Sequence, residues 1–98
     1  MPKVRVSYLG LVQNVLGRRE DEVLLRDGAS VRELLHLLEE KHGDAFRHTV
    51  LSSDDELRSP AAVLVNDRYI GELEGLDTTL TSEAEVSIVV VVYPMEGG

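Results

Sequence analysis

A run of β-branched residues near the end of the chain, Val86 to Val92, constrains the fold more than any other stretch. β-Branched side chains are stiff in a helix and pack well on a pleated sheet, so the run predicts a strand, which we place over residues 83–93. Its apolar residues occupy both faces, as is typical of a strand in the middle of a sheet. One face should carry Val86, Ile88 and Val90, and the other should carry Val89 and Val91.

Other patterns predict four further strands, which form two hairpins. Alternation of apolar and polar residues indicates strands over 3–9 and 20–26, paired with each other. A second hairpin is predicted over 61–65 and 68–70, because a turn sequence separates two apolar stretches. Residues 44–60 are polar and lack a clear period, so we expect them to form a surface loop, in which a short turn near Phe46 is one option.

One helix is predicted between the two hairpins. Ser30 and Glu33 have capping-box spacing, in which each side chain accepts a hydrogen bond from a free backbone N–H, and Gly43 is a natural stop. Apolar residues at helical spacing form a wide stripe of Val31, Leu34, Leu35, Leu37 and Leu38. These elements predict an α+β domain, with a mixed sheet of about five strands covered on one face by one main helix.

The composition excludes several classes of function. A chain of 98 residues forms one domain without room for a large catalytic cavity. A net charge of −8 and only four aromatic residues argue against nucleic-acid binding, whereas an acidic body suits a basic docking surface on a protein partner. The chain has no cysteine, no metal-ligand spacing among its three histidines and no phosphate-binding loop. These features argue against a freestanding enzyme and against a bound metal.

The N-terminal residues alternate between charged and apolar side chains, and no long apolar stretch occurs. We therefore expect no signal peptide, no membrane association and a cytoplasmic location.

The sequence ends in Gly97-Gly98. Glycine has no Cβ, so the pair can pass through a channel too narrow for any other residue, and its carboxylate is unhindered. Residues 94–98 should form a flexible tail on a domain of residues 1–93, because Pro94 cannot donate to a sheet ladder. From the residues alone, two interpretations stay open: the tail carries a reactive carboxylate, or it is a frayed end.

A second question concerns Val89, Val91 and Tyr93, which share the face of the last strand opposite the core. If the helix covers only the other face, these side chains form an exposed apolar stripe beside the tail, which would suit a partner surface. Alternatively, the loop over 44–60 covers them.

The chain resembles the ubiquitin-like β-grasp sulfur carriers, and most of all the small subunit of molybdopterin synthase (the MoaD-like family). The resemblance spans nearly the whole chain and rests on the order of its motifs. These motifs are Val4 to Tyr8, Leu16 to Glu20, Asp27 to Leu35, Val63 to Arg68, Gly75 to Thr78, Glu85 to Ile88, and Gly97-Gly98. The family usually has a small apolar residue directly before the two glycines, where this chain has Glu96.

The resemblance implies a β-grasp fold and a mechanism. Carriers of this family are adenylated at the terminal carboxylate, here that of Gly98, by an ATP-dependent activating enzyme, and a sulfur donor then forms a thiocarboxylate. In molybdopterin (molybdenum cofactor) biosynthesis, the large synthase subunit receives the tail and supplies the catalysis. The chain would then be a carrier subunit without a permanently bound cofactor. The implied site residues are Gly97 and Gly98 at the reactive end, and Tyr93, Pro94, Met95, Glu96, Val89 and Val91 as partner contacts.

Three alternatives remain open at this point. The chain could be a ubiquitin-like modifier that is joined to lysines through Gly98. It could carry sulfur for another pathway, such as thiamin, tRNA thiolation or cysteine synthesis. It could also be a β-grasp interaction module with an inert tail.

Overall fold

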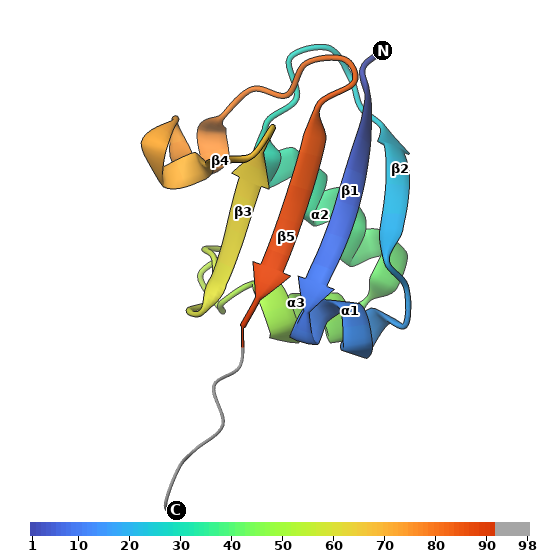
Figure 1. The fold of residues 1–98 in the computed structure, drawn as a ribbon, viewed down its shortest axis with the longest axis vertical. Helices are drawn as coiled ribbons and strands as arrows, with labels where there is room; N and C mark the ends of the chain where they lie inside the picture. The colour runs from blue at the N-terminus through green and yellow to red at the C-terminus, as the bar shows by residue number, and fades with distance from the viewer. Residues whose placement is uncertain (92–98) are drawn as a thin grey trace, which may run out of the picture.

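A computed structural model describes residues 1–91 of the chain, which form one mixed sheet with helices packed against it (Figure 1). The sheet has five strands in the order β2-β1-β5-β3-β4. The strands are β1 (Lys3–Gly10), β2 (Glu20–Leu24), β3 (Ala61–Val65), β4 (Arg68–Tyr69) and β5 (Glu85–Val90). The helices are α1 (Leu11–Leu16), α2 (Val31–His42) and α3 (Asp44–Val50), with short 3-10 turns η1 (Ile70–Glu72) and η2 (Gly75–Asp77). Within residues 1–91, every helix is too short to cross a membrane.

The last strand occupies the centre of the sheet, which confirms the prediction from its β-branched run. β5 pairs in parallel with β1 and antiparallel with β3. The side chains of Val86, Ile88 and Val90 are buried in the core. The two predicted hairpins also form, since β2 pairs antiparallel with β1 and β4 pairs antiparallel with β3. The β-grasp fold class is therefore confirmed.

The main helix, α2, begins and ends where the sequence predicted. The Ser30 hydroxyl accepts a hydrogen bond from the Glu33 amide at 3.2 Å, and the Gly43 amide donates to the Glu39 carbonyl at 2.7 Å. The carboxylate of Glu33 binds the guanidinium of Arg26. The prediction is wrong for one residue of the apolar stripe. Leu37 is 41% exposed, because it lies on the edge of the stripe rather than above the sheet.

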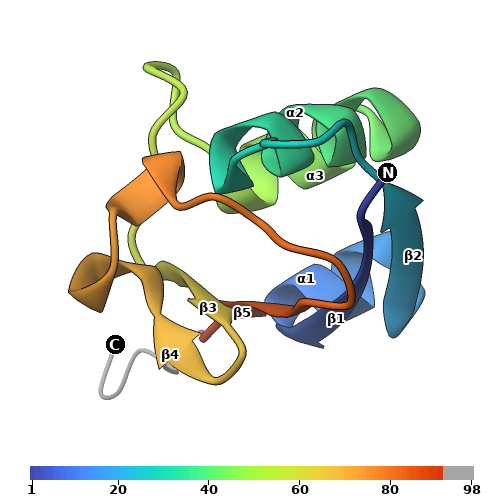
Figure 2. The same cartoon turned by 90° about the horizontal axis from the view of Figure 1, so that it is seen from above.

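The prediction of a surface loop over 44–60 is wrong in its first part, where α3 forms. Phe46 and Val50 lie four residues apart on one face of α3, and both are fully buried. α3 packs against α1 and α2 on the helical side of the sheet (Figure 2). Two apolar residues in a single turn are too few to establish a helical period, so this helix is defined by its packing rather than by its pattern.

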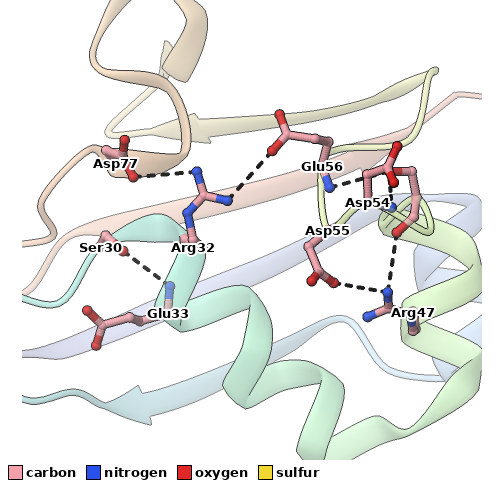
Figure 3. A network of polar contacts seen from close by, with 9 residues as sticks. Ser30, Arg32, Glu33, Arg47, Asp54, Asp55, Glu56 and Asp77 are labelled. Carbon is pink, nitrogen blue, oxygen red and sulfur yellow. Dashed lines mark hydrogen bonds and ion pairs between the residues drawn. The ribbon is translucent and has the colours of Figure 1, made fainter.

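The loop that follows α3 is held by arginines (Figure 3). Arg47 lies 2.9 Å from Asp55. Arg32, at the start of α2, lies 3.6 Å from Glu56 and 3.5 Å from Asp77 of η2. The acidic run of this loop is thus tied to α2 and to α3 by ion pairs, and Arg32 also binds Asp77 of η2, which keeps the loop at the helical side of the sheet.

Candidate functional site

Exposed and half-buried apolar side chains lie near the point where the described chain leaves the sheet. Leu9 pairs with Val89 across the β1–β5 ladder, and Val91 follows the end of β5 with 41% of its surface exposed. α1 begins directly after β1 and contacts β5 (Figure 1). Leu11 and Val15 of α1 are exposed, and their spacing of four residues places them on one helix face. We call Leu9, Leu11, Val15, Val89 and Val91 the apolar collar.

The collar depends on a close approach between the ends of β1 and β5. Gly10 pairs with Val90 and has a φ of 79°, in the left-handed region that favours glycine. A Cβ at this position would overlap the Val90 carbonyl oxygen. Glycine therefore lets the chain turn from β1 into α1 directly beside β5, which brings the side chains of α1 to the end of that strand.

The polarity of the open face of the sheet changes along the strands. At the end opposite the collar, Lys3 lies 3.3 Å from Glu22 and Arg5 lies 4.0 Å from Glu85. These ion pairs are solvent-exposed and contribute little to stability. Leu24, which pairs with Lys3 and is 63% exposed, is an apolar side chain at that same end. Leu9, Val89 and Val91 are the apolar side chains near the point where the chain leaves β5, which suits a contact surface around the tail.

A buried carboxylate, that of Asp21, links β1 and β2 to the end of α2 through hydrogen bonds and ion pairs. Asp21 of β2 accepts a hydrogen bond from the Tyr8 hydroxyl at 2.6 Å and from Lys41 Nζ at 2.9 Å. Its oxygens also lie 2.8 Å from His42 Nε2 and 2.9 Å from an Arg18 guanidinium nitrogen. An ionised carboxylate only accepts hydrogen bonds, so His42 Nε2 carries a proton in this contact. We call these five residues the Asp21 hub.

The Asp21 hub perturbs the pKa values of its members. Burial alone would raise the pKa of Asp21, but the hydrogen bonds from Tyr8, Lys41 and His42 outweigh it and lower this pKa to about 2. Burial, together with the hydrogen bond to Asp21, raises the pKa of Tyr8 well above its usual value. Asp21 is thus ionised at neutral pH, and it joins β1, the α1–β2 connection and the end of α2.

The structure answers the question left open for Val89 and Val91. Val89 is half-buried in the open face, and Val91 is exposed. α3 and the rest of residues 44–60 do not cover them, since α3 packs on the helical side (Figure 2). Sequence reasoning missed Leu9, Leu11 and Val15, although the parallel pairing of a first and last strand would have placed Leu9 beside Val89.

The other predicted site residues lie outside the described residues. They are Tyr93, Pro94, Met95, Glu96, Gly97 and Gly98. Among residues 1–91, no group of three or more His, Cys, Asp or Glu side chains is placed to hold a metal ion. The arrangement that the described residues do offer is an apolar contact surface next to the hydrogen-bonded Asp21 hub.

The chain can now be compared with known proteins. A family model described as the ThiS family matches residues 6–98. The search of curated proteins gave no match. Among solved structures, small archaeal modifier protein 1 from Methanosarcina acetivorans is 26% identical, with a TM-score of 0.81 and coverage of 97% of this chain and 98% of that one.

Two further structures place the fold among proteins with different assignments. A protein from Pyrococcus furiosus, provisionally assigned as molybdopterin converting factor subunit 1, is 26% identical, with a TM-score of 0.75 and coverage of 94% of this chain and 100% of that one. A chain of the BexX/CysO complex from Amycolatopsis orientalis is 23% identical, with a TM-score of 0.72 and coverage of 94% and 99%.

Proposed function

This chain belongs to the ThiS family of ubiquitin-like sulfur carriers, and we propose that the group it uses is the carboxylate of Gly98. An activating enzyme would join this carboxylate to the α-phosphate of ATP and release pyrophosphate. A sulfur nucleophile then displaces AMP and leaves a thiocarboxylate. Adenylation is needed because a carboxylate is a poor electrophile, and the adenylate supplies the leaving group.

The observation that carries this proposal is the apolar collar. A carrier whose reactive group is at the end of a tail needs a contact surface that positions the base of that tail. Val89 and Val91 lead directly into the tail sequence, Leu9 pairs with Val89, and Leu11 and Val15 are exposed on the neighbouring helix α1. Contacts to these side chains would bury apolar area and direct the following residues, Tyr93 to Gly98, into the active site of the partner.

The charge of the chain supports the same type of partner. The net charge of −8 favours encounter with a basic surface on the activating enzyme, which would increase the rate of association at low ionic strength. In this proposal the partner provides the catalytic groups and the ATP site, and the carrier provides the contact surface and the carboxylate.

For the pathway, we propose molybdopterin synthesis, with this chain as the small subunit of the synthase. The similarity to the Pyrococcus furiosus protein assigned to molybdopterin conversion supports this assignment. The tail would then enter the large synthase subunit and deliver sulfur to a pterin precursor. No permanently bound cofactor is required of the carrier.

A second candidate function is protein modification through an isopeptide bond between Gly98 and lysine. The similarity to small archaeal modifier protein 1 supports this candidate to the same degree. Both functions begin with the same adenylate, so one chain can serve both. They differ in the nucleophile that attacks it, which is sulfur in one case and a lysine amine in the other.

The proposal can be tested by incubating the protein with the cognate activating enzyme, ATP and a sulfide source, followed by intact-mass measurement. We expect one oxygen-to-sulfur exchange at Gly98 and complete loss of that product when Gly97-Gly98 is deleted. The collar variant Leu9→Glu should raise the KM for the carrier. Thr81→Glu, which adds the same charge at an exposed site on the far end of the sheet, serves as the matched control.

Two outcomes decide between the candidate functions, and a third tests the collar. An unchanged mass in the presence of an active enzyme would exclude the carrier mechanism. Conjugates that resist reducing agents on a denaturing gel would favour protein modification. Equal effects of Leu9→Glu and Thr81→Glu would show that the collar is not the contact surface.

A further inference from the structure

An apolar groove lies between α2 and the segment that follows β2, and none of its lining residues belongs to the collar. Its volume is about 390 Å³, and its lining includes Leu25, Ala29 and Leu37. Leu25 and Ala29 are buried and form the floor, whereas Leu37 is 41% exposed and forms one wall. An exposed leucine beside an apolar floor is an unpartnered surface within the described residues.

The groove lies beside a free sheet edge, because β2 is the outermost strand on its side (Figure 1). The Leu25 amide donates to the Pro2 carbonyl, and the Tyr8 amide donates to the Arg19 carbonyl. In an antiparallel ladder, residues bonded to the partner alternate with residues whose backbone groups point away. The register of β1 with β2 therefore directs the amides and carbonyls of Glu22 and Leu24 outward.

Carboxylates border the edge and the groove. Glu20 and Glu22 alternate along β2 on the open face of the sheet, and both are exposed. Glu33 and Glu40 line the groove from α2. The one arginine in the lining, Arg26, is already bound to Glu33 by two hydrogen bonds. Glu22 is likewise paired with Lys3 at 3.3 Å, and His36 also lines the groove. The surface is therefore apolar in its floor, and its borders keep a net negative charge through Glu20 and Glu40.

We propose that this surface binds an extended segment of a partner protein, in which apolar side chains alternate with lysine or arginine. The segment would add to β2 as a further strand and pair with the outward backbone groups of Glu22 and Leu24. Its apolar side chains would enter the groove against Leu25 and Leu37. Its basic side chains, on the other face, would lie opposite Glu20 and Glu22.

The charges exclude a second copy of this chain as the occupant. Pairing two β2 edges would place Glu20 and Glu22 of one copy opposite the same residues of the other, and like charges in facing strands repel. Charges on an edge strand generally protect against such self-association. They do not oppose a basic strand, so the same residues that prevent dimerisation select the proposed partner.

The site is independent of the proposed chemistry at Gly98, since it uses neither the tail nor the collar. It can be tested on the intact protein with the labelled peptide Lys-Val-Lys-Val-Lys-Val-Lys, by amide NMR and fluorescence anisotropy. We expect amide shifts along β2 and over the groove-facing part of α2. A scrambled peptide of the same composition, and a peptide N-methylated at alternate residues on its pairing edge, should bind about tenfold more weakly.

Substitutions on the protein surface provide a second test of the proposed peptide site. Leu37→Lys and Glu20→Lys should each weaken binding by about tenfold, and both residues are exposed, so the fold should tolerate the change. Glu72→Lys makes the same charge change at an exposed site in η1 and should leave the affinity within about twofold. The proposal is overturned if the N-methylated peptide binds as tightly as the parent. It is also overturned if Glu72→Lys weakens binding as much as Glu20→Lys, because the attraction would then be non-specific.

Discussion

Replacement of Asp21 by asparagine tests the Asp21 hub, the most strongly perturbed electrostatic site among the described residues. Asparagine keeps the shape of the side chain and removes its charge. Its amide NH₂ group would also face donors, since Lys41, His42 and Arg18 all point at the carboxylate. The variant therefore loses the charged interactions without creating a cavity.

The expected cost follows from the pKa of the group. The pKa of Asp21 falls from 3.8 to about 2 in the folded protein, and one pKa unit corresponds to about 1.4 kcal/mol. The ionised carboxylate therefore stabilises the fold by about 2 kcal/mol relative to its protonated form. The asparagine side chain resembles the protonated acid, so Asp21→Asn should lower the free energy of unfolding by about that amount near neutral pH.

The same reasoning fixes the pH dependence. The folded pKa of Asp21 lies below its unfolded value, so the stabilisation is fully present above about pH 4 and is lost as the pH falls toward about 2. The difference between the wild-type protein and Asp21→Asn should therefore be constant from neutral pH down to about pH 4 and shrink below it. Other carboxylates titrate in both proteins, and their effects largely cancel in the difference.

Urea unfolding at a series of pH values measures this difference. Asp27→Asn is the matched control, because the Asp27 carboxylate is 89% exposed and lies 3.7 Å from the N-terminal ammonium. That change should cost less than about 0.5 kcal/mol at any pH. A cost for Asp21→Asn that stays the same between about pH 6 and about pH 3 would refute the electrostatic reasoning.

Three other substitutions test the packing. Gly10→Ala should lower the free energy of unfolding, measured in urea, by about 2 kcal/mol or more, because the new Cβ would meet the Val90 carbonyl oxygen. Gly17→Ala is the control and should cost less, since Gly17 also has a positive φ but has open space around it. Phe46→Ala should cost about 3 kcal/mol or more, whereas a cost below about 1 kcal/mol would mean that α3 is not part of the core. Ser30→Ala should cost about 1 kcal/mol through loss of the α2 cap, and Ser30→Asp should restore most of it.

Elements with a strong local signal could be predicted from the sequence. The run after Glu85 is mostly β-branched and apolar on both faces, which is typical of a strand in the middle of a sheet, and β5 lies between β1 and β3. Both ends of α2 are set by local hydrogen bonds, since the Ser30 side chain accepts from the Glu33 amide and the Gly43 amide donates to the Glu39 carbonyl. These signals depend on residues close in sequence, so no knowledge of the tertiary structure was needed.

The rest depends on contacts between distant segments. α3 is held by burial of Phe46 and Val50, and the collar forms only because β1 and β5 run in parallel. The Asp21 hub joins residues from four separate segments of the chain, and in the sequence Asp21 looks like one member of an acidic run. Its inward position in the alternation of β2, opposite Val6, is the signal that could have identified it.

The central position of β5 also determines how the domain would respond to mechanical tension. The strand is bonded to β1 along one edge and to β3 along the other. Ladder bonds run across the strands, so a pull on the chain beyond Val91, directed along the strand axis, acts on both ladders in shear. Those bonds must then fail together rather than one after another. A partner that grips the end of this chain can therefore pull on it firmly without unravelling the domain behind it.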